Sequence, residues 1–217
     1  MAMTRKTQRN AGFSLVEVLL ALSLGVWLSG TILQLLLTEA QLGLRMGRVL
    51  RERSLQQRTL ALVRGDVQRA SRISTTPLLE QHACSLAGRL PVLHLSTAAG
   101  PITYSVGAAP SGIWRGQVLM RCGPAFDLQG QPSLGTAAQN RVVIDGLATK
   151  PEAWQGCRDL VSRAAAAQEL SGSSKQPFSA CLDATGAVLA IRLLQDFPSS
   201  DGRSQRISRD EVMSALV

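Results

Sequence analysis

The sequence predicts an α+β fold, in which a long N-terminal helix precedes a globular head built on an antiparallel β-sheet. Three observations lead to this prediction. Residues 18–38 carry no charged side chain and are mostly apolar. Beyond them, apolar side chains recur every three or four residues, which is the period of a helix. After Pro77 the pattern changes to short runs of β-forming residues separated by Gly, Pro and Ser.

The charge distribution argues against a nucleic-acid-binding protein. The chain has 217 residues, with 23 Lys and Arg against 15 Asp and Glu, which gives a net charge of +8. Residues 1–12 contribute +3, residues 13–39 contribute −2 and residues 40–72 contribute +6, so residues 73–217 contribute only +1. A nearly neutral head offers little basic surface to phosphates. The four Phe, three Trp and one Tyr are also too few for a base-stacking platform.

The apolar stretch of residues 18–38 is long enough to span a membrane. A transmembrane helix needs about 20 mostly apolar residues, and this stretch has 21. It is longer than the apolar region of a cleaved secretory signal, and no small-x-small cleavage site follows it. A plain signal anchor is the alternative. The flanking charges leave the orientation open, because Arg5, Lys6 and Arg9 precede the stretch and four arginines follow it within about 15 residues.

Glu17 lies at the start of this apolar region, where a carboxylate is costly unless it is paired. One interpretation places Glu17 at the water interface, where the span begins. The other interpretation requires a cation at the same depth. An α-amino group newly exposed at Phe13 would be such a cation, and a neighbouring subunit offers the same group.

Residues 9–22, with the sequence RNAGFSLVEVLLAL, resemble the class III signal of type IV pilins and type II secretion pseudopilins. The shared features are a basic leader, a Gly-Phe pair, a Glu at the fifth position after the glycine and an uninterrupted apolar run. The resemblance implies that a prepilin peptidase cleaves after Gly12 and methylates the new N-terminal Phe13. It also implies that Glu17 guides assembly.

A weaker likeness extends further along the helix. Residues 21–41 and 59–73 resemble PilW-type minor pilins and the related pseudopilin J group. The resemblance implies a type IV pilin-like fold, a cytoplasmic leader and a periplasmic head, with a single pass through a bacterial inner membrane. The implied partners are other minor pilins and the major pilin, the prepilin peptidase, the inner-membrane assembly platform, a tip adhesin and the lipid bilayer. Many major pilins have a helix-kinking proline near the position where this chain has Gln34.

We therefore expect four segments. Residues 1–12 are a cleaved cytoplasmic leader, residues 13–38 a transmembrane and assembly helix, residues 39–72 its amphipathic continuation, and residues 73–217 a periplasmic α+β head. The first proline is Pro77, so one helix can continue to residue 72.

The amphipathic continuation has one face with nine positions spaced alternately by four and three residues. Arg53 and Gln56 interrupt this face, and we expect its later part to pack into the head. The other seven positions are apolar or small: Leu42, Met46, Val49, Leu60, Val63, Val67 and Ala70.

The head is expected to form an antiparallel sheet against the second half of the helix. Residues 152–170 have a helical composition, and Ser208 to Glu211 match a capping box that predicts a last short helix. Long irregular loops are expected at residues 123–140 and 171–180. The expected strands are residues 90–96, 102–106, 113–121, 141–145 and 187–195.

All four cysteines lie in the head. A periplasmic head would be oxidised, and four cysteines allow three pairings. We expect Cys84 to pair with Cys122 and Cys157 to pair with Cys181, because these are neighbours in sequence. Zinc is the alternative, with His82 and His94 near Cys84, but the sequence has no C-x-x-C pair.

No motif indicates an enzyme. The sequence lacks Walker A, G-x-G-x-x-G, H-E-x-x-H and G-x-S-x-G patterns, and we expect no catalytic site, cofactor or metal. The sequence favours a minor pilin that primes pilus assembly or joins a tip complex. The alternatives are a tip subunit of type II secretion similar to pseudopilin J, a signal-anchored periplasmic binding protein and a membrane-tethered enzyme.

Overall fold

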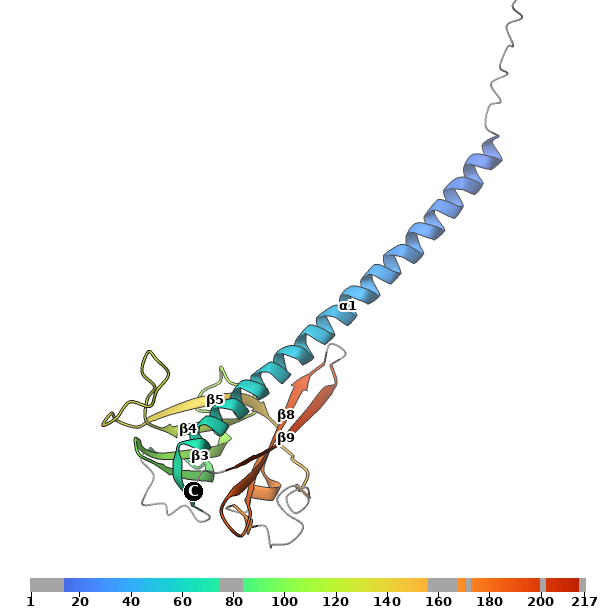
Figure 1. Cartoon of the computed structure of the whole chain (residues 1–217). Coiled ribbons are helices and arrows are strands. Elements are labelled where there is room, and N and C mark those ends of the chain that lie inside the picture. Colours follow the sequence, from blue (N-terminus) through green and yellow to red (C-terminus); the bar gives the residue numbers. More distant parts are fainter. Residues whose placement is uncertain (1–13, 75–83, 156–167, 171–172, 200–201, 215–217) are drawn as a thin grey trace, which may run out of the picture. The chain divides into compact units, whose positions relative to one another are not determined.

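The computed structural model describes residues 14–74, 84–155, 168–170, 173–199 and 202–214. The chain divides into two compact units, Met1–Arg48 and Val49–Val217. One helix, α1 (Leu15–Gln68), contributes to both units, and each unit is described separately below (Figure 1).

In the first unit, the described chain is helical from Leu15 onward, and every described side chain is exposed. No proline interrupts this stretch, and leucine, which favours helices, is its commonest residue. Three hydroxyl groups bond back to helical carbonyl oxygens at 2.8–2.9 Å, those of Ser23, Thr31 and Thr38. These polar side chains therefore need no water.

The second unit contains a single antiparallel sheet together with the last part of α1. Within the described residues the sheet has nine strands, in the order β1-β2-β3-β4-β5-β8-β7-β6, and β9 pairs with β8. The strands are β1 (Ala70–Ser74), β2 (Leu90–Thr97), β3 (Gly100–Ala108), β4 (Gln117–Gly123), β5 (Gln139–Leu147), β6 (Gln168–Glu169), β7 (Phe178–Leu182), β8 (Val188–Pro198) and β9 (Ser204–Ser214).

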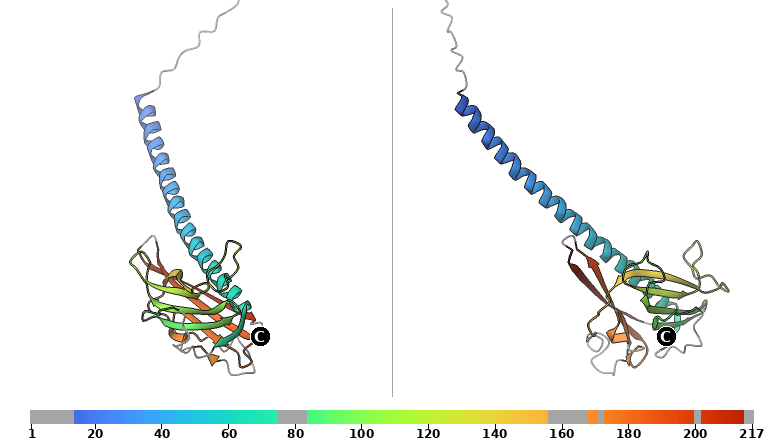
Figure 2. Two further views of the ribbon diagram at one scale, coloured as in Figure 1. Left: turned by 90° about the vertical axis from the view of Figure 1, so that its left-hand side faces the viewer. Right: turned by 180° about the vertical axis from the view of Figure 1, so that it is seen from behind.

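The sheet consists of two halves that diverge between β5 and β8. These two strands pair only at Leu147 and Gln195, whereas β9 pairs with β8 over its whole length. Figure 2 shows the hairpin of β8 and β9 turning away from the half formed by β1 to β5. The divergence leaves room for the end of α1 between the halves.

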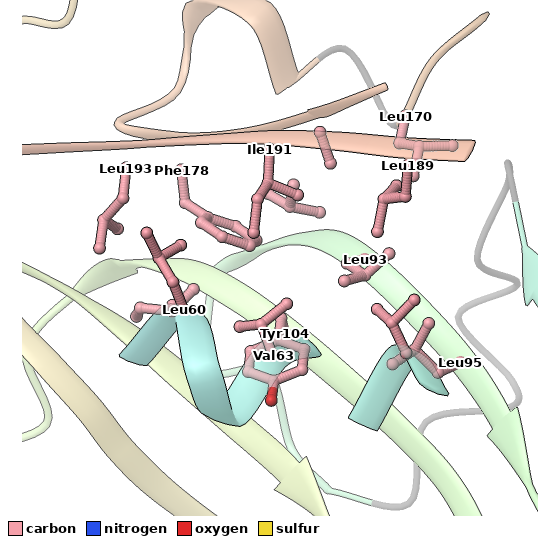
Figure 3. Close-up of a cluster of buried hydrophobic side chains, with 14 of the residues drawn as sticks. Leu60, Val63, Leu93, Leu95, Tyr104, Leu170, Phe178, Leu189, Ile191 and Leu193 are labelled. Atoms are coloured by element: carbon pink, nitrogen blue, oxygen red, sulfur yellow. The ribbon is translucent and has the colours of Figure 1, made fainter. Parts of the chain in front are cut away.

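The hydrophobic core fills the space between the two halves of the sheet. Tyr104 of β3 lies close to Phe178 of β7, with ring centroids 6.2 Å apart. Figure 3 shows one layer from the β8 half facing another from α1, β2 and β3. The first layer includes Phe178, Leu189, Ile191 and Leu193, and the second includes Leu60, Val63, Leu93, Leu95 and Tyr104; each of these side chains is at most 1% exposed.

The predicted apolar face of α1 is partly confirmed. Leu60, Val63 and Val67 are buried in the core, whereas Leu42 and Met46 are more than 60% exposed. Gln56 was predicted to interrupt the face, but it is 2% exposed and its side-chain amide donates to the carbonyl oxygen of Ile207 at 3.5 Å. A buried polar side chain is compatible with a helix face when it finds a partner on the sheet.

The predicted end of the helix at residue 72 is wrong. The helix ends at Gln68, the amide of Arg69 bonds to the carbonyl oxygen of Asp66 at 3.2 Å, and β1 begins at Ala70. Pairing of β1 with β2 takes these residues out of the helix. Tertiary pairing has overridden a local helical pattern here.

The expected strands are confirmed with shifted ends in the first half of the sheet and in β8. The expected strand at residues 113–121 begins only at Gln117, because the chain turns at Ser111 to Trp114. The predicted short helix at Ser208 to Glu211 is wrong, since these residues lie in β9 and pair with β8. Cross-strand partners decide this segment, and an isolated capping-box pattern does not.

The irregular loop expected at residues 123–140 is confirmed as far as residue 138, apart from one isolated bridge between Phe126 and Pro132. In the loop expected at residues 171–180, the structure has a 3₁₀ turn, η2 (Ser173–Lys175), and then β7, so that prediction is wrong. For the helix expected at residues 152–170, the described residues at its two ends are not helical, and β6 occupies Gln168–Glu169. Residues 156–167 lie outside the described residues.

Candidate functional site

The candidate cleavage site and the carboxylate next to it lie at the start of α1. Gly12 and Phe13 lie outside the described residues. Ser14 is the residue before the helix, and its backbone amide donates to Oε2 of Glu17 at 3.1 Å. The backbone amide of Val18 bonds to the carbonyl oxygen of Ser14 at 3.2 Å, which closes the first turn.

This hydrogen bond is one of the two that define an S-x-x-E capping box, the one in which the glutamate side chain accepts from the amide of the cap residue. The sequence analysis overlooked this signal at Ser14 and Glu17. The carboxylate also lies where the partial positive charge of the helix N-terminus stabilises an anion. Glu17 therefore has a local role at the helix start. Among the described residues, no Lys or Arg forms an ion pair with it.

The helix that follows Glu17 presents an unusually apolar surface. Within the described part of the chain, α1 is long and apolar enough to cross a membrane, and its most apolar window has a mean hydropathy of 1.9 with no part of it buried. Trp27 is 78% exposed and Leu24 is 69% exposed. So much exposed apolar surface on one element is unfavourable in water and requires lipid or other apolar helices around it.

The later part of α1 has its own carboxylate, Asp66, which is completely buried in the second unit. Arg121 of β4 binds it through two nitrogens, with Nε 2.6 Å from Oδ2 and Nη2 3.2 Å from Oδ1. The Tyr104 hydroxyl of β3 donates to Oδ2 at 2.6 Å. We call Asp66, Arg121 and Tyr104 the buried triad.

The surroundings of the buried triad complete its hydrogen bonding. Arg121 also donates from Nη1 to the carbonyl oxygen of Pro124 at 3.0 Å, and its guanidinium group lies over the ring of Phe126, 4.6 Å from the centroid. A buried ion pair is tolerated only when further hydrogen bonds of this kind compensate for lost hydration. The triad therefore fixes the register of α1 against β3 and β4.

The buried triad shifts the ionisation of two of its members. Burial, the negative charge of Asp66 and the hydrogen bond to it raise the pKa of the Tyr104 hydroxyl well above its ordinary value, and Arg121 only partly opposes this. For Arg121, burial alone would lower the pKa, but the hydrogen bonds and charge of Asp66 outweigh burial and raise it. Both groups are held in the protonated forms that serve as donors to the carboxylate.

A second polar cluster lies where β4 begins and β5 ends. Arg115 donates from Nη2 to Glu52 of α1 and to Asp145 of β5, both at 3.2 Å, and its backbone amide donates to Asp145 at 3.0 Å. Burial would raise the pKa of Asp145, but the hydrogen bonds from Arg115 lower it below its ordinary value. Gly146 follows with φ +68°, a conformation that suits glycine, and its amide bonds to the carbonyl oxygen of Arg115 at 2.7 Å.

One of the two predicted disulfides is confirmed. Cys84 is bonded to Cys122 of β4, with their Cα atoms 6.0 Å apart. Cys181 is completely buried in β7, beside Trp154 and Ala190. Its expected partner, Cys157, lies outside the described residues, so that pairing stays a prediction.

The disulfide makes Cys84 unavailable as a zinc ligand, and His94 has another role. His94 is 3% exposed, and its Nδ1 lies 2.8 Å from the hydroxyl of Thr103 on the neighbouring strand. His82 lies outside the described residues. Across the residues that the structure describes, no three His, Cys, Asp or Glu side chains are grouped as metal ligands.

The sequence analysis missed the buried triad and the Arg115 cluster. A signal was present in the charge pattern, because residues 40–72 contain eight arginines and only two acids, Glu52 and Asp66. Both acids are buried and both pair with an arginine of the head. An isolated acid on an otherwise basic helix is therefore a good candidate for a residue that is buried and pairs with a distant arginine.

The described polar clusters consist of ion pairs and of donors bound to acceptors, and the contact between His94 and Thr103 is buried within the sheet. The first unit thus has an exposed apolar helix with a carboxylate near its start, and the second unit has buried ion pairs between α1 and the sheet. Searches of protein-family models, curated proteins and solved structures found no match to this chain.

Proposed function

We propose that the chain is a minor pilin subunit of a type IV pilus, held in a bacterial inner membrane until it enters the growing fibre. Its head lies in the periplasm, and it primes assembly or joins a tip complex with other minor pilins and the major pilin. A tip subunit of type II secretion, similar to pseudopilin J, uses the same helix and the same chemistry.

One observation carries the proposal. Glu17 lies at the start of an exposed apolar helix, at the fifth position after Gly12 of a Gly12–Phe13 pair, and has no cationic partner among the described residues. A carboxylate entering an apolar fibre core needs a counter-ion. Cleavage after Gly12 supplies one, because it creates an α-amino group on Phe13 of each subunit. The carboxylate of an incoming subunit and the amine of its neighbour then set the axial position.

The chain's apolar surface explains how it moves from membrane to fibre. In the bilayer, lipid surrounds the exposed leucines of α1, and the hydroxyl groups bond within the helix. In a fibre, the equivalent helices of neighbouring subunits replace lipid at little cost in solvation.

The competing function is that of a signal-anchored binding protein, and the capping box favours it. If Glu17 only caps the helix, it needs no partner chain. Replacing Glu17 by Gln separates the two roles, because the Gln side chain still accepts from the Ser14 amide but carries no charge.

The test measures how much of each variant enters fibres in cells that lack the unmodified protein. We expect Glu17→Gln and Glu17→Ala to be cleaved after Gly12 but to enter sheared fibres at least about tenfold less than the unmodified protein. Both variants leave the α-amino group of Phe13 on the neighbouring subunit without its counter-ion, and an uncompensated buried charge costs several kcal/mol. Ser14→Ala keeps the charge and is the control that enters normally. Normal incorporation of Glu17→Gln would refute the pairing.

A further inference from the structure

The second unit has a cavity of about 400 Å³ between α1 and the start of β5. Apolar side chains form much of its wall, including Leu55 and Leu62 of α1, Phe126 of the loop after β4, and Val143 of β5. We call it the β5 cavity. It lies within one compact unit, so its walls belong to one folded body.

The charge of the β5 cavity is one-sided. Arg58, Arg121 and Arg141 line it, and no acidic residue of the described chain does. Arg121 is already neutralised by Asp66. Arg58 and Arg141 are exposed, and within the described parts of the chain neither forms an ion pair. Two unpaired guanidinium groups beside an apolar wall suit a ligand that combines a carboxylate with an apolar group.

The cavity also has an unsatisfied acceptor. Oε1 of Gln139 is buried and has no hydrogen-bond donor within the described residues, although Gln139 lines the cavity. Buried acceptors normally have a donor, so this oxygen is available to an N–H group of a ligand. A fatty acid offers a carboxylate and an apolar chain but no N–H group. A peptide offers all three.

One edge of β5 is open along the residues that line the cavity. β4 pairs with the other edge of β5, and the open edge meets β8 only at Leu147, so along residues 139–144 this edge has no strand partner among the described residues. An open edge presents alternate amide and carbonyl groups that can pair with an extended peptide. Arg141 can also protect this edge from unwanted pairing, but that role leaves the apolar cavity and the Gln139 acceptor unexplained.

We propose that the β5 cavity binds an extended segment of a partner protein, in which an apolar side chain fills the cavity and a neighbouring carboxylate pairs with Arg58 and Arg141. The segment pairs with the open edge of β5 through its backbone. Successive side chains of an extended segment point to opposite faces, so the acidic and apolar residues of the bound segment, which face the cavity, alternate with residues that face solvent. This binding activity goes beyond the function proposed above, since it requires neither cleavage after Gly12 nor polymerisation.

The test uses the full chain in detergent micelles and two fluorescein-labelled peptides, Thr-Val-Thr-Glu-Thr-Val-Thr and the same peptide with Lys in place of Glu. Fluorescence anisotropy measures binding. We expect saturable binding of the Glu peptide and about tenfold or more weaker binding of the Lys peptide. The backbone amides of an extended peptide point alternately to its two edges. N-methylation of the amides on the edge that pairs with β5 should abolish binding of the Glu peptide, whereas N-methylation of those on the opposite edge should not.

Charge reversal provides the matched variants. Arg58→Glu and Arg141→Glu change exposed side chains, and each should weaken binding of the Glu peptide about tenfold. The double reversal should then prefer the Lys peptide, a gain that a misfolded protein would not show. Arg72→Glu is the control, because Arg72 is exposed in β1 and does not line the cavity. Equal binding of the two peptides, no saturable binding, or insensitivity to N-methylation on both edges would overturn the proposal.

Discussion

Helix α1 carries one carboxylate near each end, and the two have opposite surroundings. Asp66 is completely buried and finds both an arginine and a tyrosine within its own unit. Glu17 is exposed and contacts only the backbone amide of Ser14 among the described residues. The side chains around Asp66 pack into a core, whereas those after Glu17 are apolar and exposed.

This difference shows how one helix can serve two environments. Asp66 has its counter-ion within its own unit, so its burial needs no charge from a partner subunit. Glu17 has none among the described residues, so an apolar environment around it is costly until another group supplies the charge. The sheet-bound end of α1 therefore gives stability, and we propose that its other end drives assembly.

The strongest test of the comparison breaks the buried triad. Replacing Arg121 by Ala removes the buried cation of Asp66 and leaves only the partly exposed Arg69, whose Nη1 lies 3.6 Å from Oδ1. Breaking a buried pair in this way costs about 3–5 kcal/mol. Urea unfolding of the full chain in detergent, followed by near-ultraviolet circular dichroism, measures the loss. The double variant Asp66→Asn with Arg121→Gln should lose less than the sum of its single changes. Additive losses would show that the two groups do not act as a pair.

The disulfide is the next largest contribution. Replacing Cys84 and Cys122 by Ser removes a crosslink between residues 38 positions apart, and we expect unfolding to become easier by about 2–4 kcal/mol. The same urea experiment on oxidised, reduced and doubly substituted protein measures it. Reduction of the unmodified chain should destabilise it at least as much as the substitution, because reduction also breaks the bond expected between Cys157 and Cys181. An unchanged midpoint in both would contradict the contribution.

Tyr104 gives a smaller effect and a pH signature. Its hydroxyl bonds to a charged group, so Tyr104→Phe should cost about 1.5–3 kcal/mol. Because the folded-state pKa is raised, this stabilisation is fully present below the unfolded-state pKa of about 10 and is lost as the pH rises through the folded-state value.

Tyr104 is the only tyrosine in the chain, so phenolate absorbance reports on it alone. We expect the phenolate absorbance of the folded protein to appear at a higher pH than that of the protein unfolded in guanidinium, and to appear as the folded protein unfolds. Titration at the same pH in both states would show that the hydroxyl is not buried against Asp66.

The smallest expected effect concerns the other carboxylate. Glu17→Gln keeps the acceptor for the Ser14 amide and should change the free energy of unfolding of the head, measured in urea, by less than about 0.5 kcal/mol. The same measurement on Arg121→Ala gives the comparison. We expect the ion pair of Asp66 to stabilise the folded chain and the charge of Glu17 not to. A large loss of stability in Glu17→Gln would show that Glu17 has a partner within its own chain.

Much of the fold was predictable because long periodic patterns dominate it. The apolar run of residues 18–38 and the later face with Leu60, Val63 and Val67 predicted α1, and alternating β-forming runs predicted most of the first half of the sheet. The pairing of Cys84 with Cys122 followed from their order in the chain.

The remaining features depend on contacts that a local pattern does not contain. The segment from Ser208 to Glu211 has a capping-box pattern, but its long pairing with β8 makes it a strand. Gln56 and Asp66 have polar side chains, yet both are buried because β9 and β4 provide partners far away in sequence. At Glu17 the residue was predicted, but its bond to the Ser14 amide was not.

The most direct test of the central claim is the mass of the chain's N-terminus, measured on protein extracted from membranes of cells with an active prepilin peptidase. The account predicts a chain that starts at Phe13, has lost residues 1–12 and carries one added methyl group. A chain that keeps residues 1–12 under these conditions would contradict it, because no Phe13 amine would then exist to pair with Glu17.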